Sequence, residues 1–367
     1  MYPVVILCAL PLALFTLVSD PMVQTFMARF TGAYLSQELD TEIKIDALRV
    51  TLMLNLDLEG LLVRDLKQDT LLYASSVSAD ISKSNLRKKH ILVRGITVSD
   101  ASIGLFQHKG DTLLNINQVI SNIQKEEQAA DTSASEWTFE LSALDLFNAR
   151  FRLRDETKHL EPEGIDYANL DISISTLEVT SMELINDTIN LVIHEFISSD
   201  RSGFEINHLS GHFQVSPVFL KSTDLKLHTP NSDLTLDFIL SYSDWNDYAD
   251  FIHSVNIDAS IRPSVLNLSD IGYFAKPLLV MDNELRVGGD FNGTIDNIKG
   301  KNFRFAFRDI WFDGEITLFG LPDIQETFVN LKIDGMEFTM EDIREFALPG
   351  DNRHLTISPT LDILGRI

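Results

Sequence analysis

The residues that could perform chemistry are scattered through this sequence and form no metal-binding pattern. His208 and His212 stand four residues apart, the spacing that places two metal ligands on one face of a helix. Leu209, Ser210 and Gly211 lie between them and favour a strand or a turn, where this spacing does not bring two imidazoles together. We therefore predict no metal site at these histidines.

The remaining polar motifs also lack the context that catalysis or ion binding needs. The turns Asp290-x-Asn292-Gly293 and Asp351-Asn352 resemble parts of calcium loops, but neither belongs to a twelve-residue pattern, so solvated turns are the better interpretation. The sequence has no G-x-S-x-G elbow and no glycine-rich phosphate loop. The single cysteine, Cys8, lies in an apolar run. We predict that the protein is not an enzyme and uses no cofactor or metal.

Charge excludes one class of partner. The 367 residues carry a formal net charge of −24, which would repel a phosphate backbone, so we predict no binding to nucleic acid. The basic cluster 87–90, Arg-Lys-Lys-His, stands out in this acidic chain. Contact with lipid phosphates is one interpretation, and a solvated turn is the favoured one.

The N-terminal segment predicts a membrane anchor. Residues Tyr2 to Val18 contain no charge, a run of about 17 residues that is close to the length of a membrane-spanning helix. A cleaved signal peptide is the alternative, but no basic residue precedes Arg29 and no small-x-small cleavage site is evident. Leu7 before Cys8 argues against lipid attachment, because a small side chain is expected there. We predict an uncleaved anchor over residues 1–19.

An amphipathic helix is predicted over residues 20–40. Asp20 is a suitable N-cap and Pro21 a suitable first helical residue. An apolar stripe then recurs at helical spacing: Val23, Phe26, Met27, Phe30 and Tyr34. The helix could lie at a membrane interface, close one end of the following domain, or pack on an ordinary core.

From Thr41 onward the dominant hydrophobic period is two, which is typical of antiparallel strands with one dry face and one wet face. Dipeptides such as Asn292-Gly293 and Asp334-Gly335 supply turns, and the spacing predicts at least fifteen strands. We predict that the inward residues include Leu234, Leu236, Phe238, Leu240, Val255, Ile257, Ile261, Leu285, Val287, Phe291, Phe303, Phe305, Phe307, Leu331 and Ile333.

The predicted domains are an N-terminal β unit over 41–125, a polar mobile linker over 126–135 and loosely repeated β units over 136–367. Short helices are expected near Asn117–Gln128 and Met340–Phe346. The last residues read as an interrupted strand, which suggests a fragment of a longer protein. Periodicity alone leaves two architectures open: a filled β-sandwich array, or a sheet curled around an apolar groove.

Three stretches carry a resemblance to a known family. They are DPMVQTFMARFTGAYLSQELDTEIKIDALRV, LNLDLEGLLVRDLKQDTLLYASSVSADIS and ILVRGITVSDASIGLFQHKGDTLLNI. They are similar to the N-terminal part of the TamB/AsmA-like translocation and assembly proteins, which are related to bridge-type lipid-transfer proteins. The resemblance covers about the first 125 residues and is looser beyond. The C-terminal domain that defines TamB is absent from this sequence.

The resemblance implies a single-pass protein of the inner membrane with its bulk in the periplasm. It implies a mainly β fold, in which an elongated antiparallel sheet curls into a taco-like hydrophobic groove for phospholipid acyl chains. It also implies a partner in the outer membrane. Three functions then compete: phospholipid transport to the outer membrane, a scaffold for assembling outer-membrane proteins, and a structural envelope protein with a filled core. An inward charge such as Phe305→Asp is expected to impair the first and to unfold the third.

Overall fold

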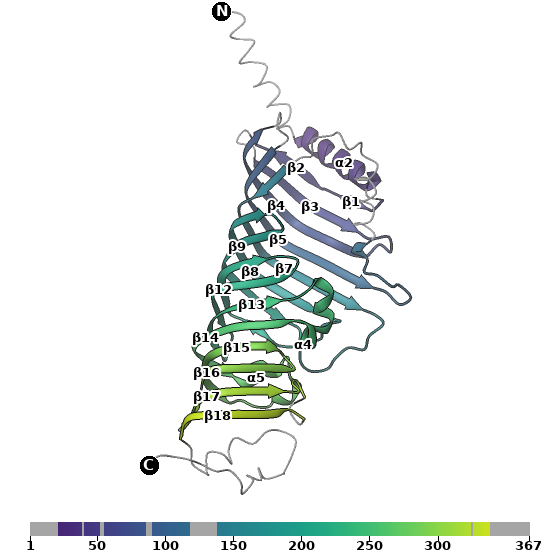
Figure 1. Cartoon of the computed structure of the whole chain (residues 1–367). Helices are drawn as coiled ribbons and strands as arrows, with labels where there is room; N and C mark the ends of the chain where they lie inside the picture. The colour runs from purple at the N-terminus through teal and green to yellow at the C-terminus, as the bar shows by residue number, and fades with distance from the viewer. Residues whose placement is uncertain are drawn as a thin grey trace, which may run out of the picture.

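The computed structural model describes residues 21–38, 40–51, 55–85, 90–117, 138–323 and 326–337. Its strands form a single large, open sheet of eighteen strands (Figure 1). The mainly β fold predicted from the sequence is confirmed. The strands before and after the predicted linker belong to this same sheet, because β5 (His90–Gln107) pairs with β7 (Leu144–Asp155).

The first part of the chain begins with helix α2 (Pro21–Glu38). The strands that follow are β1 (Ile43–Lys44), β2 (Ala47–Val50), β3 (Asn55–Arg64), β4 (Thr70–Asn85), β5, β6 (Thr138–Leu141), β7, β8 (Asp171–Ile185), β9 (Thr188–Asp200), β10 (Glu205–Ile206) and β11 (His208–Val215).

The second part continues the sheet with two short helical insertions. Its strands are β12 (Phe219–His228), β13 (Asp233–Ser241), β14 (Asn256–Asn267), β15 (Glu284–Thr294), β16 (Asn297–Phe307), β17 (Ile310–Phe319) and β18 (Phe328–Glu337). One insertion holds the 3₁₀ helix η1 (Trp245–Asp250) and α4 (Phe251–Ser254). The other holds α5 (Leu268–Gly272) and η2 (Lys276–Leu278).

Most strands pair with the next one along the chain in an antiparallel meander, as the short turns predict. One junction differs from the predicted antiparallel sheet. Both β6 and β7 run parallel to β5. Two parallel neighbouring strands need a long connection, because the chain must return to the edge where the first strand began. Residues 108–137, between β5 and β6, are long enough for this connection.

The strand registers gather apolar side chains on one side of the sheet, here named the apolar face. Directly paired residues share a face, and two rows of such pairs follow the sheet. The first row is Leu58, Val77, Val98, Leu146, Leu177 and Phe196. The second row is Leu191, Phe213, Ser222, Phe238, Ala259, Phe291, Gly300, Ile316 and Leu331.

β-Bulges keep these side chains on the same face where the sequence alternation slips by one residue. In β12, Leu220 and Ser222 are in one phase, whereas Leu225 and Leu227 are in the other. Between them Asp224 has φ 53°, and the strand register shifts there. Asp100, Asn148 and Asn302 have φ of 52°, 53° and 50° at similar slips in β5, β7 and β16. Asp and Asn tolerate this left-handed conformation better than most residues, which explains why they occupy these bulges.

The opposite side of the sheet, here named the polar face, carries ion pairs between neighbouring strands. Arg150 Nη2 lies 2.6 Å from Asp171 Oδ2, and Arg304 Nε lies 2.7 Å from Asp313 Oδ1. These arginines donate hydrogen bonds and hold the pKa of Asp171 and of Asp313 below the usual range. Arg262 contacts both Asp224 and Asp237. Each exposed pair contributes little alone, but together they keep this face wet.

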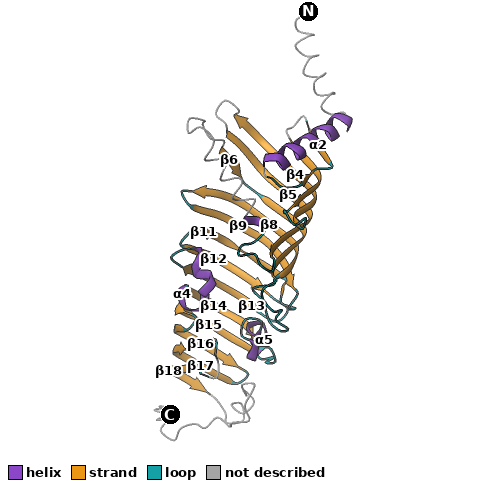
Figure 2. Cartoon of the chain, turned by 90° about the vertical axis from the view of Figure 1, so that its right-hand side faces the viewer, coloured by secondary structure: helices purple, strands orange, loops and turns teal. Residues whose placement is uncertain are grey.

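The predicted curl into a taco-like groove is not observed, because the sheet is open and uncurled (Figures 1 and 2). Sequence alternation determines which side of a strand is apolar, but the angle between successive strands depends on twist and bulges along the whole sheet. The same local pattern is therefore compatible with a flat, twisted or curled sheet. The filled-sandwich alternative is not observed either, since the described strands form one sheet.

The predicted helix is present as α2, and its predicted apolar stripe is divided, because Met27 packs against the sheet and the aromatic residues do not. Ala28 is fully buried, whereas Phe26, Phe30 and Tyr34 are 69%, 64% and 55% exposed. A small residue allows the helix backbone to approach the sheet closely. Packing geometry therefore decides which of the apolar residues face the sheet.

The predicted anchor 1–19, the linker 126–135 and the helix Met340–Phe346 lie outside the described residues, as does nearly all of the helix Asn117–Gln128. Within the described ranges, no helix has both the length and the apolar character needed to cross a membrane.

The bulge at Ser181 in β8 provides a test of this architecture. Ser181 has φ 54°, and the register shifts between Thr180 and Glu183. Ser181→Val should lower the free energy of unfolding by about 1–2 kcal/mol, because a β-branched residue is strained in this conformation. Ser181→Gly should not lower it. The control Ser173→Val, at an exposed site of the same strand with ordinary φ, should be nearly neutral in denaturant titrations. Equal effects at both positions would contradict the bulge.

Candidate functional site

The apolar face is the largest feature of the described structure that could bind a ligand. The registers and strand alternation place on this face the predicted inward residues that lie within strands. Most of them are half-buried, including Leu234, Leu236, Phe238, Leu240, Ile257, Ile261, Phe291 and Phe303. Leu331 and Ile333 on β18 are 46% and 43% exposed. Side chains under a second protein layer would be far less exposed, so this part of the face is open to a ligand.

The N-terminal end of the apolar face is covered by α2. Ala28 of the helix packs with Ile45 and Leu48, and Met27, Leu56, Leu58 and Leu61 surround them. The close approach is visible at Gly32, where a Cβ atom would lie 3.1 Å from the carbonyl oxygen of Ile43. The helix therefore closes this end of the face.

A second cover lies over β15 and β16. Leu268 and Met281 of the α5 insertion pack with Leu285, Val287 and Phe307 into a buried cluster, and Phe305 contacts it. These strand residues were predicted to meet lipid, but the insertion occupies their inward side. Val255, also predicted, is fully buried next to α4. These positions support the fold, whereas Phe238 and its half-buried neighbours remain accessible.

A phenylalanine cluster lies beside the covered region. The ring centroids of Phe291 and Phe303 are 5.7 Å apart, and those of Phe303 and Phe312 are 5.8 Å apart. Phe291 and Phe303 remain half-buried. Phe291 and Phe303 meet edge to face, Phe303 and Phe312 are tilted, and the rings also present an apolar surface.

One long edge of the sheet is a wall of loops, in which the buried aspartates are Asp65, Asp166 and Asp270. Asp166, 5% exposed, lies in the connection from β7 to β8. Its carboxylate accepts hydrogen bonds from the backbone amide of Glu161 at 2.9 Å, from the Asn169 side chain and from Arg201 Nη2 at 2.9 Å. Burial alone would raise the pKa of Asp166, but these hydrogen bonds and the charge of Arg201 together hold it below its usual value.

Asp270 has the equivalent role farther along the same edge. It is 6% exposed and lies in the first turn of α5. Its Oδ2 accepts hydrogen bonds from the hydroxyl groups of Thr229 and Ser232, both in the turn between β12 and β13. The two parts of the wall meet where the amide of Ile165 donates to the carbonyl of Tyr273 at 2.8 Å.

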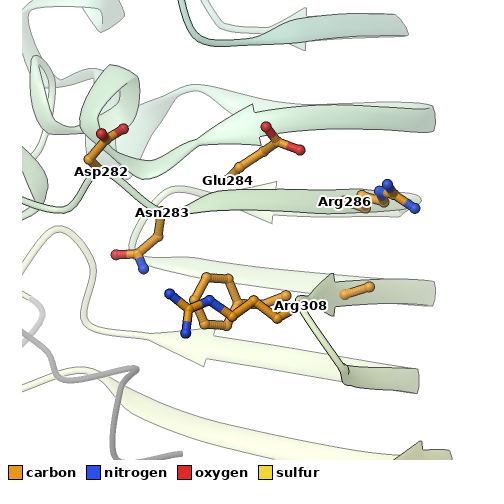
Figure 3. A pocket seen from close by; sticks show the side chains of 7 residues that line it. Asp282, Asn283, Glu284, Arg286 and Arg308 are labelled. Carbon is orange, nitrogen blue, oxygen red and sulfur yellow. The ribbon is translucent and has the colours of Figure 1, made fainter. Parts of the chain in front are cut away.

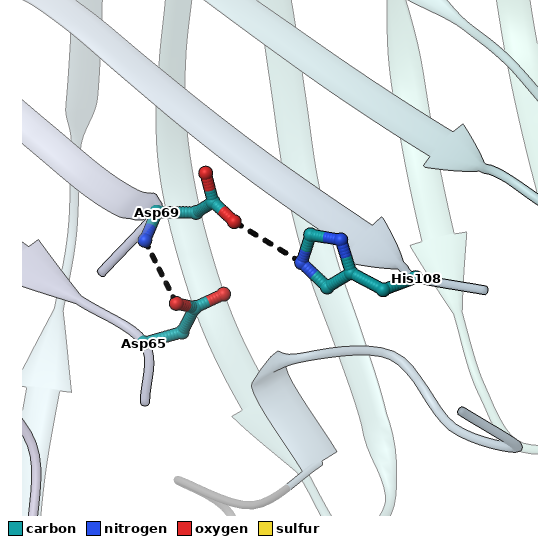
Figure 4. Close-up of side chains that lie close together, drawn as sticks. All are labelled: Asp65, Asp69 and His108. Carbon is teal, nitrogen blue, oxygen red and sulfur yellow. Dashed lines mark hydrogen bonds and ion pairs between the residues drawn. The ribbon is translucent and has the colours of Figure 1, made fainter. Parts of the chain in front are cut away.

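A His–Asp cluster occupies the wall near the N-terminal end (Figure 4). Ligand atoms of Asp65, Asp69 and His108 lie within 4.8 Å of one another. His108 Nε2 is 3.1 Å from Asp69 Oδ2, but this buried nitrogen has no hydrogen-bond partner among the described residues. Asp65 is already engaged, since Oδ1 accepts from the Asp69 amide and Oδ2 from Asn115. These hydrogen bonds of Asp65 explain why the three residues lie together: they join neighbouring loops of the wall.

The opposite edge of the sheet carries an aromatic cluster around η1 and α4, so the two insertions face each other across β13–β15 (Figure 2). The Tyr242 ring lies 4.9 Å from Tyr248 and 5.4 Å from Trp245. The Tyr242 hydroxyl donates to the Ser216 carbonyl at 2.8 Å. Burial, followed by its interaction with Tyr248, raises the pKa of Tyr242 to about 12. The Tyr242 phenol is therefore neutral at physiological pH, and its contacts hold the η1–α4 insertion against this edge of the sheet.

A recess of about 370 Å³ at the start of β15 does not suit an apolar ligand (Figure 3). Asp282, Glu284, Arg286 and Arg308 surround it, so its charges balance. Figure 3 shows the labelled side chains spread around the recess instead of converging on one point. Its polar lining gives no reason to assign it a specific ligand.

The histidines considered in the sequence form no site. His208 Nδ1 lies 2.8 Å from Glu195 Oε1, and His212 belongs to the neighbouring part of β11 across a bulge. Sequence reasoning missed the wall of loops. Its signals were present as isolated aspartates with turn residues nearby, but their convergence on one edge depends on the meander.

The arrangement defines an open, one-sided β-sheet protein with an apolar face, a wall of loops along one edge and a helix over one end. No protein-family model matches this chain, and no curated protein matches it.

The buried carboxylate of Asp166 predicts a pH-dependent part of the stability. Its folded pKa is lowered, so its contribution is complete above the unfolded value of about 3.9 and is lost as the pH falls through the folded value. Asp166→Asn should reduce stability at pH 7 and flatten the loss of unfolding free energy below about pH 4. Denaturant titrations from neutral to acidic pH measure this slope. The exposed turn variant Asp187→Asn should keep the wild-type slope, and equal slopes in all three proteins would contradict the assignment.

Proposed function

We propose that this protein binds phospholipid acyl chains on its apolar face and assists their transport from the inner to the outer membrane. In this proposal residues 1–19 anchor the chain in the inner membrane, the sheet extends into the periplasm, and an outer-membrane assembly partner receives the far end. The observation that carries the proposal is the continuous apolar face, which the described residues cover at the α2 end and below the α5 insertion.

The dimensions of the face suit a conduit. Thirteen successive strand pairings lead from β3 to β18 along the sheet. They pass through β4, β5, β7, β8, β9, β11 and β12, and then through every strand up to β18. At 4.7–4.9 Å a step this is roughly 60 Å. The row from Leu191 to Leu331 contains no charged residue, so a chain could move along it without crossing a fixed charge.

The energetics favour a hydrocarbon occupant. Contiguous exposed apolar surface is uncommon on monomeric soluble proteins and often marks a binding site. Burial of each methylene contributes about 0.8 kcal/mol, so ten of them contribute about 8 kcal/mol before ordering costs. Because the gain is spread along the face, no single position needs to bind strongly. This is the behaviour expected of a path along which lipid slides.

Two adjacent residues of β13 test the proposal. Phe238 is on the apolar face, and Ile239 is on the polar face, where it is 36% exposed. Phe238→Asp should reduce the phospholipid that co-purifies with the full chain about tenfold, equivalent to about 1.4 kcal/mol. Ile239→Asp adds the same charge to the same strand and should retain wild-type lipid. Lipid is measured by mass spectrometry, and circular dichroism checks that both variants keep their strands.

Wild-type protein without phospholipid, or equal lipid in both variants, would overturn the proposal. Phe238 is a better test than Phe305, because Phe305 also packs against the α5 insertion and its replacement would disturb the buried cluster.

A second candidate function is a scaffold that adds strands of client outer-membrane proteins. The observation that favours it is β18, which pairs with β17 and, within the described chain, with no other strand. Its side chains Phe328 and Val329 are 64% and 50% exposed. An edge with unpaired backbone groups is a template for strand addition.

Proline substitutions distinguish the scaffold from the lipid path. Asn330→Pro and Leu331→Pro each remove one amide, and in an antiparallel pair one of two successive amides faces outward. The scaffold predicts that one of the two variants loses binding of an unfolded outer-membrane β-barrel protein in a pull-down, while its phospholipid content stays unchanged. Loss of phospholipid with client binding intact would favour the lipid path.

A further inference from the structure

The outward side of α2 is apolar, although the helix already buries its other side. Met22, Phe26, Phe30 and Tyr34 recur every fourth residue and are 84%, 69%, 64% and 55% exposed. The rings of Phe26 and Phe30 are stacked, with centroids 6.3 Å apart. These residues form what is here named the aromatic stripe of α2. Its spacing places it along one line of the helix surface.

The direction of the aromatic stripe is fixed by packing on the sheet. Ala28 is fully buried against Ile45 and Leu48, and Gly32 lies against the backbone of Ile43. The helix cannot turn the aromatic stripe toward the sheet without replacing these small residues at the contact by large rings. Figure 2 shows α2 lying across the end of the sheet, with one side directed away from it.

Charge indicates what kind of surface meets the aromatic stripe. The chain as a whole has a net charge of −24, yet α2 contains only two charged residues, Arg29 and Glu38. Arg29 is exposed and lies between the two stacked phenylalanines in sequence. Aromatic rings and arginine together are favoured in the headgroup region of a bilayer, where rings enter the acyl boundary and the guanidinium meets phosphates.

The position of α2 in the chain brings it to such a surface. The uncharged run Tyr2–Val18 ends three residues before Pro21, the first residue of the helix. If that run is inserted as the proposed function requires, α2 starts at the membrane surface. The inference rests on this membrane placement.

We propose that α2 lies flat in the headgroup region of a phospholipid bilayer, with Phe26 and Phe30 at the acyl boundary and Arg29 on lipid phosphates. The helix then binds two different surfaces: Ala28 holds the sheet, and the aromatic stripe holds the membrane. This orients the N-terminal end of the apolar face next to the bilayer, where lipid would enter it.

Quenching by brominated lipids tests this placement in the full chain. Trp137, Trp245 and Trp311 are replaced by Phe, and Phe30→Trp supplies the only indole. The protein is reconstituted in vesicles of phosphatidylcholine and phosphatidylglycerol, with bromine atoms near the headgroup end of the acyl chains. Indole fluorescence at position 30 should fall by roughly half, as for a ring at the acyl boundary. A matched protein that keeps only Trp311, 37% exposed on the distant β17, should be unaffected.

The outcomes separate the two proposals. Protein that floats with the vesicles and shows no quenching at position 30 would overturn the placement of α2 and leave the proposed anchor intact. Protein that does not float with the vesicles would overturn both. Quenching that falls as protein density in the vesicles rises would indicate that the aromatic stripe contacts another copy of the chain, and would also overturn the placement of α2. Circular dichroism of each variant confirms that the strands are retained.

Discussion

A single hydrogen-bonded layer with one apolar face is the constraint on which the rest of this structure depends. Main-chain pairing satisfies the backbone of each inner strand, so the sheet can extend by simple addition of hairpins. Strand pairing does not bury the apolar face, however, because the described strands provide no second sheet to cover it. Among the described residues, two buried hydrophobic clusters form where α2 and the α5 insertion fold onto the apolar face. In the proposed function, phospholipid acyl chains complement the part that these elements leave uncovered.

The bulges make this one-sidedness possible over long strands. A slip in the alternation would otherwise turn half of a strand to the wrong face. Asp100, Asn148, Asp224 and Asn302 accept a left-handed backbone at such slips. Several also contribute polar groups to the outer side, as when the Asn302 amide donates to Asp290 at 2.9 Å. The same residues therefore keep apolar side chains on the apolar face and add polar groups to the polar face.

Stability and the proposed binding surface occupy different parts of the molecule. Buried aspartates organise the loops along one edge, and the aromatic cluster around Tyr242 fixes the other. Neither edge requires the middle of the apolar face to be filled. Residues such as Phe238 can consequently remain half-buried without loss of the surrounding architecture. This division is what a protein needs if its apolar surface is to accept and release hydrocarbon.

The sequence by itself determined the mainly β fold, the helix near residues 20–40 and the apolar side of strands with clear alternation such as β13 and β14, because these follow from local periodicity and capping. Slips in alternation stand beside Asp100, Asp224 and Asn302 in the sequence, but they were not predicted to form bulges. Only the tertiary structure decided that the sheet is open, since curvature is the sum of many small strand angles. Tertiary packing also decided that Ala28, and not Phe30, faces the sheet. It likewise placed Phe307 beneath α5 and brought Asp166 to Arg201, because those contacts join residues far apart in the chain.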